Sequence, residues 1–462
     1  MLPMRLKAKP IGPVCPTGPL RHSIRRRSCS VKGYSRIRPA FFGRALRLPR
    51  SCRMALRRRL GRRSRLGGIG SVDQRCTVKT ARSFGCIQYN EGRKGTAMTI
   101  VRLASAHVKR LDRDATLPAR FGRLLSQLEL GARFKGKRVA IKMHVGGEIG
   151  FYTIHPLFVR ILVQAVREAG GSPYLTDGAF SIDAATARGY TPEVVGCRIV
   201  GASGEHDLYV YKRQTDVPGL PEIEVCGNIV DADALIVFSH GKGHGHTGFG
   251  GAIKNIGMGC VSYRTRGWIH ALMSGHFAWQ GELCTHCRQC ISGCPTGAIR
   301  FNDQDEIAIS EHHCRFCMHC VRACPAEALS MDQPEEKFRL FQAGMAAVAK
   351  EVLGSFEAGA VTYITCLMNI TPLCDCWGFS TPPLVPDIGI LQSDNIVAIE
   401  QASLDMVKTE NLIAQNVPDQ LMPMGEAGHL FQRIHGKDPY EQIRQCVAAG
   451  LGTTDYAIEE VK

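Results

Sequence analysis

The sequence predicts an α/β fold: a mainly parallel sheet with helices on both faces, interrupted by a small α+β insert rich in cysteine. Two observations support this. Apolar strand-like runs alternate with amphipathic helix-like runs from Met98 onward, as in parallel sheets with crossover helices. The same alternation resumes after the cysteine-rich stretch. We therefore expect one α/β domain in two parts, 98–280 and 333–462, around an insert at 281–332.

The first part of the domain contains short apolar runs of the kind that form buried parallel strands. The predicted strands are residues 138–143, 174–176 and 234–238. A helix is expected between the first two of them, because Pro156 suits a first helical turn and apolar residues then recur at helical spacing. The glycine pair at 170–171 should end this helix.

The second part continues the alternation. Its predicted elements are an amphipathic helix at 334–353, strands at 360–365 and 388–391, and a helix at 395–407. Since strand-like and helix-like segments lie on both sides of the insert, the insert is expected to be tied at both ends to the same sheet.

Two copies of one cysteine pattern, C-x2-C-x2-C-x3-C-P, lie thirty residues apart in the insert. This run is typical of proteins with two [4Fe–4S] clusters, in which three cysteines of one run bind one cluster and the fourth binds the other. The flanking residues repeat as well, and residues 281–332 resemble a bacterial-type two-cluster ferredoxin. The predicted ligands are Cys284, Cys287, Cys290 and Cys324 for one cluster, and Cys314, Cys317, Cys320 and Cys294 for the second.

Zinc sites and disulfides are the alternative uses of these cysteines. A zinc site needs four ligands and usually shows two separated C-x2-C pairs, whereas each run here is a tight triplet followed by Cys-Pro. Disulfides require an oxidising compartment, and no secretory signal is evident. The spacing therefore favours iron–sulfur clusters.

The basic charge of the chain is confined to residues 1–97. The chain has a net charge of +17, but this segment alone has 25 Lys and Arg and only Asp73 and Glu91 as acids, so the remainder is at −6. We expect a basic disordered extension, open to interpretation as a transit peptide, a nucleic-acid-binding arm or an export signal. We favour translation starting at Met98, because Glu91 to Gly95 could be encoded by purine-rich, ribosome-binding-like codons.

A glycine–histidine loop follows the strand at 234–238 and extends through Asn255. It should lie at the carboxyl edge of the sheet, where open α/β folds bind ligands. Histidines there can bind metal or move protons, and lysines can hold an anion. Residues following the strands at 138–143 and 174–176 should meet the loop, Asp177 among them. The candidate catalytic residues are His144, Glu148, His240, His244, His246 and Lys254.

A third cysteine group follows the strand at 360–365. Cys366, Cys374 and Cys376 could bind an additional metal or act as a redox dithiol, and the strain of a Cys-x-Cys disulfide favours metal. The alternative is that they are small packing residues in a tight loop.

Several segments together resemble the DUF362 family, a domain of unknown function, in members with a ferredoxin insert. They are the strand ending in Lys142-Met143-His144, the loop Gly250-Gly251-Ala252-Ile253-Lys254-Asn255, Cys374-Asp375-Cys376 and Pro386-Asp387-Ile388-Gly389-Ile390. The resemblance covers roughly residues 98–462. It implies the architecture and iron–sulfur binding but supplies no substrate.

Together these features predict an iron–sulfur oxidoreductase in which two [4Fe–4S] clusters serve a substrate or extra-metal site in the α/β domain. Its partner would be a redox protein or a small molecule. The alternative is a ferredoxin-type electron carrier or accessory protein whose α/β domain docks a redox partner.

Nucleic-acid binding is disfavoured, since the body of the chain is acidic. No run of 18 apolar residues predicts a membrane span, and the free cysteines predict a cytoplasmic location.

Overall fold

The computed structural model describes residues 98–310, 313–332, 334–422 and 424–462. These residues all belong to one contact unit, Cys86–Lys462. The predictions for residues 1–97 fall outside the described part of the chain. Within that part, no helix is long and apolar enough to cross a membrane.

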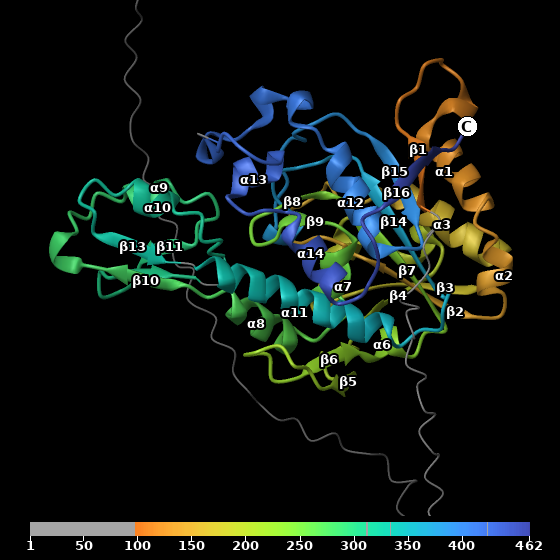
Figure 1. Cartoon of the computed structure of the whole chain (residues 1–462), viewed down its shortest axis with the longest axis horizontal. Helices are drawn as coiled ribbons and strands as arrows, with labels where there is room; N and C mark the ends of the chain where they lie inside the picture. The colour runs from red at the N-terminus through yellow and green to blue at the C-terminus, as the bar shows by residue number, and fades with distance from the viewer. Residues whose placement is uncertain (1–97, 311–312, 333, 423) are drawn as a thin grey trace, which may run out of the picture. The chain divides into compact units, whose positions relative to one another are not determined.

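An eight-stranded sheet forms the centre of the fold, and it is mainly parallel, as predicted (Figure 1). Only β15 runs antiparallel to its neighbours, β1 and β14. In spatial order the strands are β16 (Tyr456–Glu460), β1 (Thr99–Ser105), β15 (Gly389–Ser393), β14 (Val361–Leu367), β7 (Ala234–His240), β2 (Arg138–Met143), β3 (Ser172–Asp177) and β4 (Arg198–Gly201).

The central strands are buried on both faces, which explains their continuous apolar sequences. All seven residues of β7 are buried. Strand β7 lies between β2 and β14 and runs parallel to both. Because β2, β3, β7 and β14 all point the same way, the loops that follow them meet at one edge of the sheet.

Helices cover both faces of the sheet (Figure 1). On one face lie α1 (Leu117–Ser126) and α3 (Pro156–Glu168), where Phe121 of α1 stacks on Phe238 of β7 at a centroid distance of 6.0 Å. The short helices α2, α4 and α5 follow the same part of the chain. Their bounds are Leu130–Phe134, Ile182–Ala187 and Pro192–Val195.

The other face is covered by α7 (Ala252–Gly257) and α12 (Ile396–Met406). Outside α7 pack α11 (Glu335–Leu353) and α14 (Glu441–Ala448). The remaining elements of the host domain are β5 (Val210–Arg213), β6 (Ile223–Cys226), α6 (Gly227–Val230), β8 (Lys242–His244), β9 (Gly248–Gly250), α8 (Tyr263–Leu272) and α13 (Leu430–His435).

The predicted elements agree with these bounds to within a few residues, and local chemistry explains why. Helix α3 starts where expected because His155 accepts a hydrogen bond from the Leu157 N–H and Pro156 occupies the first turn. The helix ends at Glu168, just before Gly170, which has a φ of +80°. The side chain of Asn395 caps α12 by accepting from two backbone N–H groups.

The cysteine-rich segment has two small sheets and its own apolar cluster, which includes Ile299, Leu329 and Met331. Its first and last strands pair antiparallel, with His276 opposite Asp332, so the chain enters and leaves side by side. Between them lie a second hairpin and two short helices (Figure 1). The elements are β10 (His276–Trp279), α9 (Gln289–Ser292), β11 (Ile299–Phe301), β12 (Ile307–Ile309), α10 (His319–Arg322) and β13 (Leu329–Asp332).

Candidate functional site

Four cysteines line each of two small cavities in the cysteine-rich segment. In each cavity three cysteines come from one run and the fourth comes from the other run, which is the grouping expected from the spacing. The first cavity is lined by Cys284, Cys287, Cys290 and Cys324, and the second by Cys294, Cys314, Cys317 and Cys320.

The two cysteine runs wrap their cavities with the same backbone. His286 and Phe316, at equivalent positions, have φ values of 54° and 53°. Arg288 and Met318, also equivalent, have φ values of 60° and 64°. Left-handed backbone is uncommon for residues other than glycine. Its repetition at matched positions shows that the two loops share the same local backbone form.

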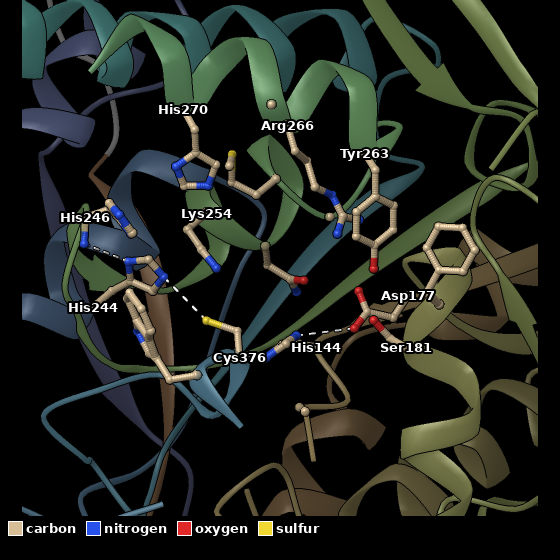
Figure 2. A pocket seen from close by; sticks show the side chains of 18 of the residues that line it. His144, Asp177, Ser181, His244, His246, Lys254, Tyr263, Arg266, His270 and Cys376 are labelled. Carbon is tan, nitrogen blue, oxygen red and sulfur yellow. Dashed lines mark hydrogen bonds and ion pairs between the residues drawn. The ribbon is translucent and has the colours of Figure 1, made fainter. Parts of the chain in front are cut away.

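A cavity of about 660 Å³ lies at the carboxyl edge of the large sheet. Residues from the loops after β2, β3 and β7 line it, as do residues of α8 and of the cysteine-rich segment, His313 and Phe316. Figure 2 shows Tyr263, Arg266 and His270 descending from α8 toward the cavity, with Cys376 and His144 facing them. The candidate residues predicted from the sequence all line this cavity: His144, Glu148, His240, His244, His246 and Lys254.

A buried ion pair supports the floor of the cavity. Lys142 Nζ lies 2.9 Å from Asp177 Oδ1, and the two side chains are 1% and 5% exposed. Lys142 also donates to Asn255 Oδ1 at 2.8 Å. Burial alone would raise the pKa of Asp177, but Lys142 and His144 lower it well below its usual value. Asp177 is therefore an anion that ties the end of β3 to β2 and to the loop that follows β2.

His144 is oriented by this same carboxylate. Its Nδ1 lies 3.3 Å from Asp177 Oδ2, and because an ionised carboxylate only accepts, Nδ1 carries the proton (Figure 2). The Val145 N–H donates to the same oxygen at 3.0 Å. Burial would lower the pKa of His144, but the charges of Cys374 and Asp177 raise it overall. The Nε2 atom is buried and has no hydrogen-bond partner among the described residues.

The glycine–histidine loop is a buried β8–β9 hairpin rather than a flexible surface loop. Burial, aided by Lys242, lowers the pKa of His240 to about 3, and its Nε2–H donates to the Met368 carbonyl at 2.7 Å. Burial, aided by Lys254, likewise lowers the pKa of His244 well below its usual value. Both rings are therefore neutral at physiological pH.

His246 connects this hairpin to the cysteine-rich segment. Its Nε2–H donates to the Cys314 carbonyl at 2.8 Å, and Cys314 is one of the cysteines of the second small cavity. The His246 ring also stacks on Trp377 at 5.5 Å between centroids. The wall of the large cavity is thus continuous with the loop that lines the second cysteine cavity.

Cys374 caps a short 3-10 turn, Asp375–Trp377, and Cys376 lies within this turn, where it lines the cavity. Burial would raise the pKa of Cys374, but its hydrogen bond with Cys376 and the positive charge of Lys242 lower it well below the usual value. The same hydrogen bond, together with burial, raises the pKa of Cys376 well above it. The pair therefore holds one proton and one negative charge. That charge raises the pKa of Lys254 against the lowering effect of burial.

The third cysteine group is only partly assembled. Cys374 and Cys376 lie within 4.8 Å of a ligand atom of His144, whereas Cys366 is buried in β14 and lies outside this group. The sequence pattern predicts His144 at the same sheet edge but groups the two cysteines with Cys366, and not with His144, as metal ligands. It does not single out Tyr263, Arg266 and His270, although their spacing marks one face of a helix.

The fold and site define an α/β protein with a buried polar cavity at the carboxyl edge of a mainly parallel sheet and a candidate metal-binding group in its wall. The chain belongs to the family described as "Domain of unknown function (DUF362)", whose model matches residues 139–405, more than half of the chain. No curated protein matches it.

One partly similar solved structure is that of the lactate racemase apoprotein from Thermoanaerobacterium thermosaccharolyticum. The match has 13% sequence identity and a TM-score of 0.28. It covers 58% of this chain and 51% of that one, so it spans about half of the racemase chain.

Proposed function

We propose that this chain is an iron–sulfur oxidoreductase that binds two [4Fe–4S] clusters and reduces or oxidises a small molecule in the 660 Å³ cavity. One observation carries the proposal: each of the two small cavities is lined by three cysteines of one run and by the fourth cysteine of the other run. This is the ligand pattern of two-cluster ferredoxins.

The separation of the sulfurs supports clusters over zinc. A zinc ion bonds sulfur at about 2.3 Å, so tetrahedral geometry brings its sulfurs to about 3.8 Å from one another. Among the described residues, only His144, Cys374 and Cys376 bring three such ligand atoms within 4.8 Å. No three of the eight cysteines come this close in the described part of the chain, so they do not form a ready-made zinc site, and they form no disulfides.

The contact between the second cysteine cavity and the large cavity favours an enzyme over a plain carrier. When bound, the clusters would supply single electrons. His313 and Phe316, on either side of Cys314 and Arg315, belong to the wall of the large cavity. A carrier that only docks a partner has no need of an internal cavity lined by lysine, arginine and histidine. Lys254 and Arg266 would hold an anionic group, and His270, which lines the same cavity, would exchange protons with it.

Cluster binding is tested by iron and sulfide analysis of protein purified without oxygen. We expect about eight irons per chain and the electron paramagnetic resonance of reduced cubanes. Cys290→Ser and Cys320→Ser should each lose iron. Cys446→Ser, which changes a buried cysteine outside the segment, is the control and should retain it. Iron below about four per chain in the unaltered protein would refute the two-cluster assignment.

The role of the cavity is tested by filling it. Gly267 lines the cavity from α8, and a Cβ there would meet no atom within 4 Å, so Gly267→Leu extends into open space. Gly122 in α1 is also helical and open but lies outside the cavity, which makes Gly122→Leu the matched control. Reoxidation of the reduced protein by small anionic oxidants should slow at least tenfold in the first variant only. Equal rates in both variants would favour the carrier alternative.

A further inference from the structure

The geometry points to a mononuclear zinc-class metal site formed by His144, Cys374 and Cys376, with its fourth coordination position open to the large cavity. The site deepens the proposed function because it lies in the same cavity. It stands on its own geometry, however, since none of its ligands lines either small cysteine cavity.

The three side chains already meet as a metal would require. One ligand atom from each lies within 4.8 Å of the other two. They come from the loop after β2 and the loop after β14, two strands separated in the sheet by β7. The backbone N–H of Cys376 donates to Cys374 Sγ at 3.4 Å, a contact that favours negative charge on that sulfur.

His144 is presented in the form that a metal ligand needs. Its Nδ1–H donates to Asp177, so a metal would be bound through Nε2. That Nε2 atom is buried and has no hydrogen-bond partner among residues 98–310, 313–332, 334–422 and 424–462. A carboxylate that fixes the far nitrogen of a histidine is the usual outer contact of a zinc ligand. An unsatisfied buried nitrogen would otherwise destabilise the fold.

His244 also lies near the group but is excluded as a ligand by its own hydrogen bonds. Its Nδ1 accepts from the backbone N–H groups of His246 and Thr247, at 3.2 and 3.4 Å. A backbone N–H only donates, so the proton of this neutral ring is on Nε2. That Nε2 lies 3.6 Å from Cys376 Sγ (Figure 2). His244 is therefore a positioning residue that donates to the sulfur.

Two sulfurs and one imidazole favour zinc over harder ions such as magnesium or calcium. Structural zinc sites have four protein ligands, whereas catalytic sites keep three and leave one position for water or substrate. Cys376 and His144 both line the cavity, and so do Lys242 and Lys254. The open position would therefore take an oxygen atom of an anionic substrate, such as a carboxylate or a carbonyl beside one.

The site is tested by loading purified protein with Zn²⁺, removing excess ion and counting zinc by mass spectrometry. We expect one zinc per chain in the unaltered protein and at least tenfold less in His144→Ala and Cys376→Ser. Cys366→Ser is the control and should lose no zinc, because Cys366 is a nearby buried cysteine outside the group. His244→Ala should also retain zinc. Zinc-edge X-ray absorption should show two sulfurs at about 2.3 Å and light atoms at about 2.0–2.1 Å.

Zinc content in Cys376→Ser equal to that of the unaltered protein would overturn the site, and so would a Cys374–Cys376 disulfide in place of bound zinc. Loss of zinc in His244→Ala with normal folding would overturn the three-ligand assignment. Iron is counted in the same samples. Zinc that is bound in iron-free protein and lost in Cys376→Ser would refute the clusters and support this site, while eight irons without zinc would support the clusters and refute this site.

Discussion

Replacement of Asp177 by asparagine should destabilise the protein strongly at pH 7. The change keeps the shape of the side chain but removes the charge that faces Lys142 at 2.9 Å, in a place where both side chains are almost fully buried. Breaking a buried ion pair by removing one partner costs about 3–5 kcal/mol, because the other charge is left uncompensated. The contribution is fully present at pH 7, since the pKa of Asp177 lies well below its usual value, and it is lost as the pH falls through that lowered pKa.

The cost converts to a measurable fall in melting temperature. Unfolding entropy is about 2.1 cal/mol/K per residue, which gives about 0.8 kcal/mol per kelvin for residues 98–462. A loss of about 3–5 kcal/mol therefore lowers the midpoint by about 4–6 °C. Circular dichroism of samples kept without oxygen provides the measurement.

Two controls accompany this variant. Asp394→Asn breaks the ion pair of Arg133 and Asp394, also at 2.9 Å but with Asp394 58% exposed, and should lower the midpoint by about 1 °C or less. The double variant Lys142→Met, Asp177→Asn removes both buried charges and should recover much of the loss. Equal midpoints for Asp177→Asn and Asp394→Asn would refute the reasoning.

Three further changes test other parts of the structure. Burial raises the pKa of Glu400 to about 8. The free energy of unfolding measured by urea titration should therefore fall by about 2–3 kcal/mol between pH 6 and 8.5. Glu400→Gln should remove this pH dependence. Arg315→Gln removes a buried charge beside the second cysteine cavity and should lower that cluster's potential by tens of millivolts in a redox titration, leaving the other cluster unchanged. Gly243→Ala places Cβ 2.3 Å from the Pro372 carbonyl oxygen and should lower the melting temperature, whereas Gly122→Ala should not.

The strands and helices could be predicted because their signals are local. The apolar run of β7 and the proline and histidine at the start of α3 each determine structure within a few residues. Which cysteines line the same small cavity could also be anticipated, since the spacing of such runs pairs three cysteines of one run with the fourth of the other.

The candidate metal-binding group of the large cavity could not be predicted as a set in the same way. His144 and Cys376 are 232 positions apart in the chain, and only the order β14–β7–β2 in the sheet brings their loops together. Cys366 seemed a better companion for the cysteine pair because it is close in sequence, yet it lies within the strand and not in the loop that follows. The antiparallel direction of β15 had no local signal either.

The insert completes the host domain as well as extending it. His246 holds the Cys314 carbonyl, and Phe316 closes part of the cavity wall. A wall supplied by a separate segment exists only once that segment has folded. On the proposed function, if folding of this segment requires all eight thiols to be ligated, the newly made protein would have no finished chamber for a substrate until its clusters were bound. Iron availability would then control maturation of the protein as well as the activity proposed for it.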